Sequence, residues 1–539
     1  MLPLPTWPTV LASAGAAIWI ALGIAALDAV LVAAGGCVLL GLVLAFAASV
    51  PLGRRVRTRR LELAWWLSGG SSGEGTVIVP GTPFEIRCYV RHVDARTLRL
   101  RELVPLTDGA HGALEEGATP TASDVLEVPP GTRVEFGLRL LAPAVGRVVV
   151  HGLASRLLGP LGLFEVPLYF PNPIVVRVLP RAARLGTTGP ARVAVERAGL
   201  SGVRRRGEGT ELHELREHRP GDPFRAIAWK ASARRGRLVV RELEQEIQRT
   251  HVAVLDVSGT MRGGPPGRRK LDVAIDAVAT DARRVLEQGD RFGLWCVDGR
   301  VTAHVVPREG PGQLPRVWDA LLSVTAVVDA DLTDVDDDAL VEIVARYVRT
   351  QDGVEIARHG RPPRLDVEAL LSHVRRVLGS GRADGIVAPT PQSALLRRYC
   401  QQRAIALPPR PEPAAGVKVR GLADVMRAIV ARASEPVELT LVTDFDAMDD
   451  LEPLLAAVRL ARARAHRVRC VAIDGRGLLP LPRDEHERAL AVVLGHGEVR
   501  RLSRARAQFG ALGVPVVTLG SLARDSWMPP RSRTAQAVA

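Results

Sequence analysis

The chain has 539 residues, of which 47% are hydrophobic and 24% charged, and its formal net charge is +14. A chain of this length is too long to fold around one hydrophobic core, and its ordinary globular composition excludes wholesale disorder. We therefore expect two or three folded units. The positive charge does not indicate nucleic-acid binding. Arginines are scattered among acids, and the 4% of aromatic residues offer few stacking platforms for single strands. Of the 72 basic residues only three are lysines: Lys230, Lys270 and Lys418.

The five cysteines are odd in number, far apart and free of any C-x-x-C pair. Such spacing excludes a disulfide framework and a zinc site built on cysteine, and it is typical of a reducing compartment.

The first predicted elements are two membrane-spanning helices, Pro8–Leu27 and Ala29–Val50. Asp28 is the only charged residue between Trp7 and Leu52, and this apolar stretch is about twice the ~20 residues that one span requires. Because a charge at mid-bilayer is costly, we place Asp28 at the turn between the spans. The alternatives are a buried core hairpin and a secretory signal peptide. The latter is excluded because no basic residue precedes the apolar run and the run is too long.

Five arginines follow the second span, within residues 54–60. Arginines beside a span mark the cytoplasmic side. With two spans, we expect the N-terminus and all later domains to lie in the cytoplasm, anchored to the inner membrane by residues 1–60.

Residues 61–181 are expected to form a β-sandwich-like domain. Short alternating runs such as Phe84–Val90 and Val134–Leu140 are separated by turns rich in proline and glycine. This pattern is typical of antiparallel strands, and it contains no catalytic cluster. We therefore expect an interaction or spacer module here.

Residues 182–249 form a charged junction in which acids alternate with arginines around Trp229, which we expect to be buried. His213 and His218 do not indicate a zinc protease, because they are five residues apart and not four. The junction contains an unevenly spaced motif made of Arg216, Pro220, Gly221, Asp222, Arg225, Ile227, Trp229, Ala233 and Arg234.

With this motif and the apolar strand and Asp-x-Ser that follow, the chain resembles the MoxR-associated family of membrane-tethered von Willebrand factor A (VWA) proteins, domain of unknown function fifty-eight. One departure is His218, where the family usually has an aromatic residue. The resemblance covers the whole architecture and implies a partner, a MoxR-type AAA+ ATPase. It assigns the surface with Arg216, Arg225, Trp229 and Arg234 to the family signature.

Residues 250–539 are expected to form an α/β doubly wound (Rossmann-type), VWA-like domain. The apolar run His251–Leu255 predicts a buried parallel strand, and apolar residues from Leu271 to Leu286 recur at helical spacing. Further strands are predicted in a parallel sheet with one antiparallel edge: Phe292–Val297, Val301–Val306, Leu439–Thr443, Val468–Ile473 and Val514–Leu519.

The predicted site lies where the first strand ends, the edge at which open α/β sheets bind ligands. Asp256-Val-Ser258-Gly-Thr260 resembles the first segment of the metal-ion-dependent adhesion site of VWA domains. Hydroxyl oxygens of Ser258 and Thr260 suit Mg²⁺, with Asp256 orienting a water and Asp444 as second acidic contributor. The resemblance implies a further threonine ligand, at whose position this chain has Ala423, a departure that removes one oxygen from the site.

An insertion is expected at residues 329–418, ending in a proline-rich linker over residues 408–413. The acidic run from Asp329 is not a calcium loop, because Asp334 and Leu340 occupy the positions that need glycine and glutamate. Asp336–Asp338 are instead expected to open a helix, Ala339–Arg349, whose dipole they complement.

Two functions remain open, neither of them enzymatic, because the sequence contains no P-loop or H-E-x-x-H motif. The first is a membrane-anchored adaptor that binds protein partners and works with a MoxR-type AAA+ ATPase in assembly or maturation of other complexes. The alternative is a cell-envelope scaffold protein with a degenerate metal site.

Overall fold

The computed structural model describes residues 3–55, 61–67, 78–93, 97–107, 113–114, 125–183, 205–207, 211–219, 224–245, 248–358, 364–379, 386–403, 405, 407–410, 416–478 and 482–520. The chain divides into two compact units. The first comprises Met1–Arg184, Pro265–Arg268 and Leu322–Pro411, and the second comprises Leu185–Gly264, Arg269–Leu321 and Glu412–Ala539.

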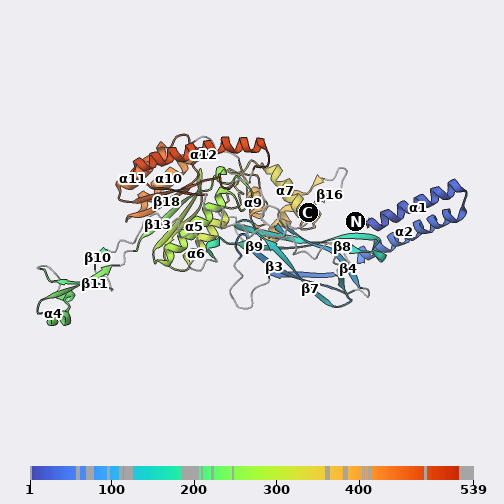
Figure 1. Cartoon of the computed structure of the whole chain (residues 1–539), viewed down its shortest axis with the longest axis horizontal. Helices are drawn as coiled ribbons and strands as arrows, with labels where there is room; N and C mark the ends of the chain where they lie inside the picture. Colours follow the sequence, from blue (N-terminus) through green and yellow to red (C-terminus); the bar gives the residue numbers. More distant parts are fainter. Residues whose placement is uncertain are drawn as a thin grey trace, which may run out of the picture. The chain divides into compact units, whose positions relative to one another are not determined.

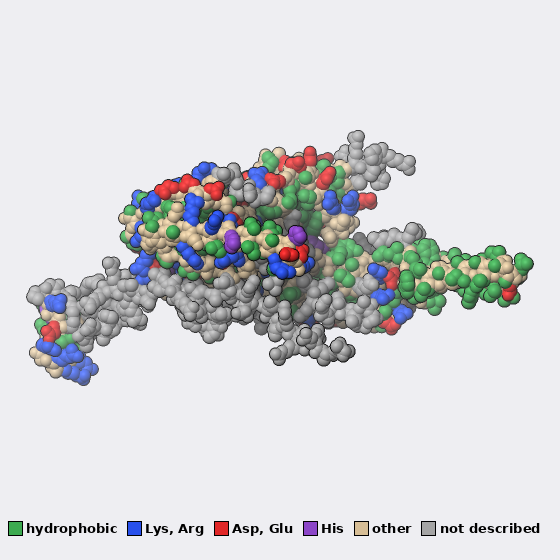
Figure 2. All heavy atoms as spheres, turned by 45° about the horizontal axis from the view of Figure 1, so that its top comes forward, with side chains coloured by type: hydrophobic (Ala, Val, Ile, Leu, Met, Phe, Trp, Pro, Cys, Tyr) green, Lys and Arg blue, Asp and Glu red, His purple; other side chains and the backbone are tan. Residues whose placement is uncertain are grey.

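The first unit begins with a helical hairpin, α1 (Trp7–Ala26) and α2 (Ala29–Arg55), drawn in blue in Figure 1. Asp28 lies between the helices, and its carboxylate accepts a hydrogen bond from the amide of Val30 at 2.8 Å. Segments Trp7–Ala26 and Ala29–Gly53 are long and apolar enough to cross a bilayer. Figure 2 shows the hairpin surface covered by hydrophobic side chains. These two helices indicate a membrane protein, as predicted.

Two antiparallel sheets form a sandwich, and all their strands except β1 follow the hairpin in the chain. One has the strand order β1-β9-β8-β4-β6 and the other β2-β3-β7-β5. Alternate side chains of both sheets, such as Ile86, Leu138 and Leu153, meet in one hydrophobic core. The strands are β1 (Leu4–Pro5), β2 (Leu61–Leu67), β3 (Pro83–His92), β4 (Leu98–Thr107), β5 (Ala113–Leu114), β6 (Leu126–Val128), β7 (Arg133–Leu141), β8 (Gly146–Leu158) and β9 (Phe164–Val178).

A helical region with its own core completes the first unit. Its helices are α7 (Asp337–Thr350), α8 (Val367–Leu378) and α9 (Pro391–Gln402), and a short ladder joins β16 (Ala357–Arg358) to β17 (Arg364–Leu365). Their apolar faces share a core that extends from Val328 to Leu407. The predicted opening of α7 is confirmed, because the Asp336 carboxylate accepts a hydrogen bond from the amide of Ala339 at 2.7 Å.

The signature segment of the second unit is a small three-stranded sheet with one short helix. The strand order is β10-β12-β11, and the elements are β10 (Arg205–Gly207), β11 (Glu211–Glu217), α4 (Trp229–Arg235) and β12 (Val239–Gln245). The expectation of a buried tryptophan is wrong, since Trp229 is 60% exposed. Its place in the first turn of α4 turns the ring outward, and the buried positions beside it are Ile227 and Ala228.

A six-stranded sheet forms the body of the second unit, in the order β15-β14-β13-β18-β19-β20. Its strands are β13 (Thr250–Asp256), β14 (Arg291–Asp298), β15 (Arg300–Arg308), β18 (Val437–Thr443), β19 (Arg467–Ile473) and β20 (Val516–Leu519). All neighbours are parallel except β14 and β15, so the predicted antiparallel edge is confirmed. The strand order reverses between β13 and β18, where open sheets bind ligands.

Helices cover both faces of this sheet (Figure 1). They are α5 (Lys270–Glu287), α6 (Gln313–Ser323), α10 (Val417–Arg432), α11 (Glu452–Ala463) and α12 (Glu485–Ala511). α10, α11 and α12 share a core with Val252 and Val254 of β13, whereas Ala253 and Leu255 are buried outside that core. Strands that are buried on both faces explain the continuous apolar runs in the sequence.

Candidate functional site

The carboxyl end of β13 carries the first part of the predicted site. Asp256 is the last residue of the strand, and its Oδ1 accepts a hydrogen bond from the amide of Ser258 at 3.0 Å. This short turn leads into a 3₁₀ helix, Gly259–Met261, which holds the Ser258 Oγ 3.2 Å from the Thr260 Oγ1. Asp256 and Ser258 are both fully buried.

Asp444 joins these residues because β18 pairs with β13 in parallel, so that both strands end at the same edge. Thr260 Oγ1 donates to Asp444 Oδ1 at 3.3 Å. On the β18 side, Thr443 Oγ1 donates to Asp256 Oδ2 at 2.6 Å. The four residues predicted from the sequence, Asp256, Ser258, Thr260 and Asp444, therefore lie together in one site.

A lysine occupies the middle of this site. Lys418, in the first turn of α10, places its Nζ 2.7 Å from Asp256 Oδ2, 2.7 Å from Asp444 Oδ1 and 2.7 Å from Thr260 Oγ1. Only 1% of Lys418 is exposed. An ammonium group has three N–H donors, and three oxygens surround it, so its hydrogen-bonding capacity is filled. We call Asp256, Thr260, Lys418 and Asp444 the Lys418 cluster.

A second lysine extends the network outward. Lys270, the first residue of α5, lies 3.1 Å from Asp444 Oδ2, 3.3 Å from Asp446 Oδ2 and 3.7 Å from Glu498 Oε1. Each oxygen of the Asp444 carboxylate thus faces its own lysine. Glu498 of α12 also accepts a hydrogen bond from the amide of Gly475 at 2.6 Å. The network therefore ties α5, α10 and α12 to the carboxyl edge of the sheet.

The electrostatics favour the ionised forms of Asp444, Lys418 and Lys270. Burial by itself would raise the pKa of Asp444, but Lys418 and Lys270 outweigh it and hold that pKa well below its usual range. Burial by itself would lower the pKa of Lys418, but Asp256 and Asp444 raise it above its ordinary value. The pKa of Lys270 is raised in the same way, because Asp444, Asp446 and Glu498 outweigh its burial.

The residues present do not fit Mg²⁺. A magnesium ion needs about six oxygens at roughly 2.0–2.1 Å in octahedral array. The three oxygens that would start such an array surround an ammonium nitrogen at hydrogen-bond distance instead. Among the residues that the structure describes, no group of three or more histidines, cysteines, aspartates and glutamates is placed to hold a metal ion.

The expected position of the third metal ligand is wrong. Ala423 lies in the second turn of α10, where it is fully buried in the core with Leu422 and Met426. The reason is that α10 begins at Val417, so its first turn, and with it Lys418, faces the carboxyl edge. Lys418 belongs to the second unit, whose last segment begins at Glu412.

Sequence reasoning missed Lys418 and Lys270 as site residues. Neither belongs to a local motif, and Lys418 is separated from Thr260 by 158 positions in the chain. One signal in the sequence could have drawn attention to them, because the chain is rich in arginine and has only three lysines. The structure brings two of these lysines to the carboxylate of Asp444.

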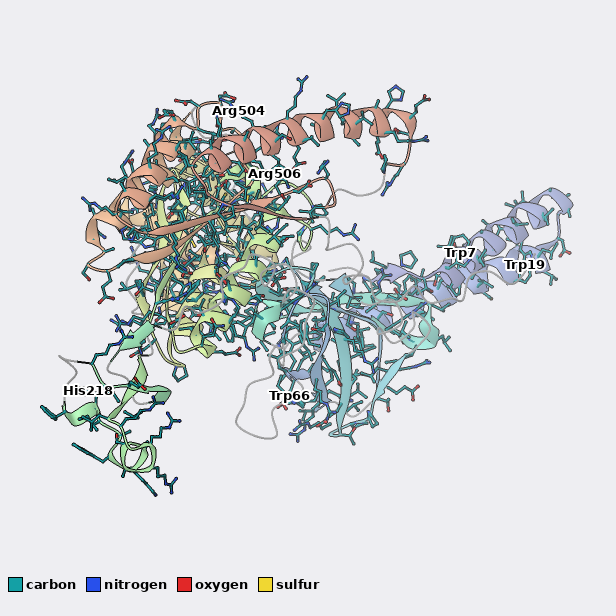
Figure 3. All side chains as sticks on the ribbon, turned by 60° about the vertical axis from the view of Figure 1, so that its left-hand side comes forward. Trp7, Trp19, Trp66, His218, Arg504 and Arg506 are labelled. Atoms are coloured by element: carbon teal, nitrogen blue, oxygen red, sulfur yellow. The ribbon has the colours of Figure 1, made fainter. Side chains whose placement is uncertain are left out.

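The signature residues are placed in part. Pro220, Gly221 and Asp222 lie outside the described residues. Arg216 is in β11 and Arg225 in the 3₁₀ helix Phe224–Ala226, whereas Trp229 and Arg234 are exposed on α4. Figure 3 shows side chains of this segment, near the labelled His218, pointing away from the ribbon.

Chemically, the site is a buried network of ion pairs and hydrogen bonds. The Ser258 hydroxyl is fully buried beside Thr260. The carboxylates of Asp256 and Asp444 already accept hydrogen bonds from Ser258, Thr443 and the lysines. A general base must be within reach of a substrate proton, and these carboxylates are enclosed.

Comparison with known proteins gives one family. No curated protein matches the chain. Among solved structures, one described as "X-ray structure of Northeast Structural Genomics Consortium target SoR45" matches at 11% identity, over 24% of this chain and 93% of that chain, with a TM-score of 0.15. The family described as "Protein of unknown function DUF58" matches residues 214–349, from β11 through β15 and into α7. Residues 214–349 thus carry a domain of the DUF58 family, the family that the sequence resembles.

Proposed function

We propose that the protein is a non-enzymatic, membrane-anchored adaptor. In this proposal a VWA-like domain binds protein partners, and the partner is a MoxR-type AAA+ ATPase that acts in assembly or maturation of other complexes. The proposal places the chain in the inner membrane with its folded units in the cytoplasm, on the strength of the two spans and the arginines at residues 54–60.

The observation that carries the adaptor proposal is the exposed surface of the signature segment. Phe224 is 74% exposed and Trp229 is 60% exposed. Lys230, Arg234 and Arg235 follow on α4 and are exposed as well. We call these five residues the Trp229 surface. Large aromatic side chains beside arginines are typical of the residues that dominate binding energy at protein interfaces.

The burial of the site residues also supports a non-enzymatic role in this proposal. A hydrolase would need a nucleophile beside a base in an accessible cleft. Ser258, Asp256 and Asp444 are buried, and hydrogen bonds link Ser258 to Asp256 and Thr260 and link Asp256 to Thr443. These contacts favour a structural role for the carboxyl edge of the sheet. In this proposal, partners bind to exposed surfaces such as the Trp229 surface.

Site-specific photo-crosslinking tests the proposal. A photoreactive phenylalanine analogue at position 229 of the full-length protein, in native membranes, is expected to capture an AAA+ ATPase. The matched control carries the same analogue at Leu460, a 38%-exposed apolar residue of α11, and is expected to capture none. Capture from both positions, or from neither, would count against an adaptor that binds through this surface.

The alternative, a cell-envelope scaffold with a degenerate metal site, draws support from one observation. The cation position of the site holds a lysine ammonium. A Phe224→Ala, Trp229→Ala double variant separates the two proposals, because it alters only exposed side chains. A double variant that reaches normal membrane levels and fully complements loss of the gene favours the scaffold, and failure to complement favours the adaptor.

A further inference from the structure

The Lys418 cluster has the form of a cation site whose cation belongs to the protein. Two carboxylate oxygens and one hydroxyl oxygen converge from β13, its following turn and β18, each 2.7 Å from one nitrogen. Oxygens that converge from separate loops at the carboxyl edge are typical of a site that binds a metal ion. Here the nitrogen comes from α10 of the same chain.

Lysine is chemically suited to this place, and arginine is not. The lysine ammonium is a compact point charge with tetrahedral donors, whereas the guanidinium of arginine is planar and directs its donors as a fork. The chain has 72 lysines and arginines, and only three of these are lysines. Two of the three, Lys418 and Lys270, lie on the two oxygens of Asp444. The third, Lys230, is on the exposed surface of α4.

A divalent ion and the ammonium cannot share these oxygens. The ion would have to lie about 2.0–2.1 Å from the same oxygens, which are 2.7 Å from the Nζ. The two like charges would then be almost in contact in a buried site, where repulsion is weakly screened. The ammonium of Lys418 has no direct route into solvent, because only 1% of the residue is exposed.

We propose that the ammonium of Lys418 is the resident cation of the Asp256–Asp444 site and that it excludes divalent metal ions from it. The site therefore does not capture a partner's carboxylate through a metal. It works as a permanent internal cross-link between α10 and the carboxyl ends of β13 and β18. This inference does not depend on the identity of the partner.

Mn²⁺ binding to the full-length protein in detergent, followed by electron paramagnetic resonance, tests the proposal. Wild-type protein and a Lys230→Ala control are expected to bind no Mn²⁺ saturably. Lys418→Ala is expected to bind one ion per chain, because the oxygens of Asp256, Asp444 and Thr260 are then left without a cation. Adding Asp256→Asn to Lys418→Ala should abolish that binding.

Two outcomes would overturn the proposal. One is saturable binding to the wild-type protein that is lost in Asp256→Asn. The other is absence of binding to a folded Lys418→Ala variant, since lysine would then not be what excludes the metal.

A second measurement needs no variant and remains decisive where Lys418→Ala does not fold. The folded wild-type protein is treated with an amine-acylating reagent, and the three lysines are quantified by mass spectrometry. Lys418 is expected to react roughly 100-fold more slowly than Lys230, because it reacts only on local opening. Equal rates at Lys418 and Lys230 would overturn the proposal.

Discussion

Two buried cations, one in each unit, are held in different ways. Lys418 in the second unit is surrounded by two carboxylates and a hydroxyl. Arg397 in the first unit is also 1% exposed, but its guanidinium donates to the carbonyls of Val328 and Val335 at 2.7 and 2.8 Å and to the Thr333 hydroxyl at 2.9 Å.

The difference shows what each cation is for. The planar fork of Arg397 collects neutral oxygens from one irregular segment, residues 328–335, and fixes it against α9, so that the arginine satisfies backbone groups. Lys418 neutralises two carboxylates that converge from separate strands. Only the second arrangement reproduces the charge and oxygen set of a metal site, and only there does removal of the cation expose a binding site.

Removing one carboxylate of the Lys418 cluster should have the largest effect. Asp444→Asn leaves Lys418 and Lys270 buried with less negative charge, which is expected to cost about 3–5 kcal/mol of local stability. Amide hydrogen exchange in β13 and β18 measures it. The matched control is Asp424→Asn, which breaks the exposed Asp424–Arg427 pair on the same helix as Lys418 and should change exchange by at most about 0.5 kcal/mol. Equal protection of the β13 and β18 amides from exchange in Asp444→Asn and Asp424→Asn would contradict this prediction.

Arg397→Met should have the next largest effect on stability, and the loss should fall in a different part of the molecule. The carbonyls of Val328 and Val335 lose their donors, which is expected to cost about 2–4 kcal/mol, since an unpaired buried acceptor costs roughly 1–3 kcal/mol. Hydrogen exchange should accelerate in α7 and α9 and remain unchanged in β13. Added Mn²⁺ should not restore protection, in contrast to Lys418→Ala. Restoration by metal would show that the two buried cations are equivalent after all.

The smallest predicted effect concerns Asp298, the last residue of β14, a carboxylate whose burial raises its pKa to about 6. The folded protein then holds a proton that the unfolded chain releases near its ordinary pKa of about 3.9. The resulting stability is fully present below about pH 4 and is lost as the pH rises through 6. We expect a loss of about 2 kcal/mol, which allows for partial exposure of the side chain.

Asp298→Asn should remove this pH dependence and make the protein more stable than wild type at pH 7. Hydrogen exchange of β14 amides between pH 5 and 8, corrected for intrinsic exchange rates, measures it. Identical pH profiles for variant and wild type would contradict the assignment to Asp298.

Much of the architecture could be predicted from local patterns. The apolar segments on either side of Asp28 predict a helical hairpin, because each segment is long enough for one membrane-spanning helix and Asp28 suits a polar turn between them. The run His251–Leu255 and the helical spacing that begins at Leu271 define β13 and α5. The positions of Asp256 and Asp444 were predictable too, since Asp256 ends β13, Asp444 directly follows β18, and the ends of parallel strands meet at one edge.

Residues whose role depends on distant parts of the chain were not predictable in this way. Trp229 was expected to be buried because tryptophan is large and apolar, yet its exposure depends on which face of α4 meets β12. Ala423 was expected beside the metal site because the resemblance puts a ligand at its position, yet it lies in the second turn of α10 and is buried in the core.

The sequence by itself determined the membrane hairpin, the strand-rich first unit, the open sheet of the second, and the polar residues at its carboxyl edge. These follow from periodicity and from local chemistry, which act over a few residues. Only the tertiary structure decided which cation fills the edge. Lys418 is 158 residues from Thr260 along the chain, and no local pattern joins them. They meet because α10 begins one residue before the lysine, at the edge where β13 and β18 end.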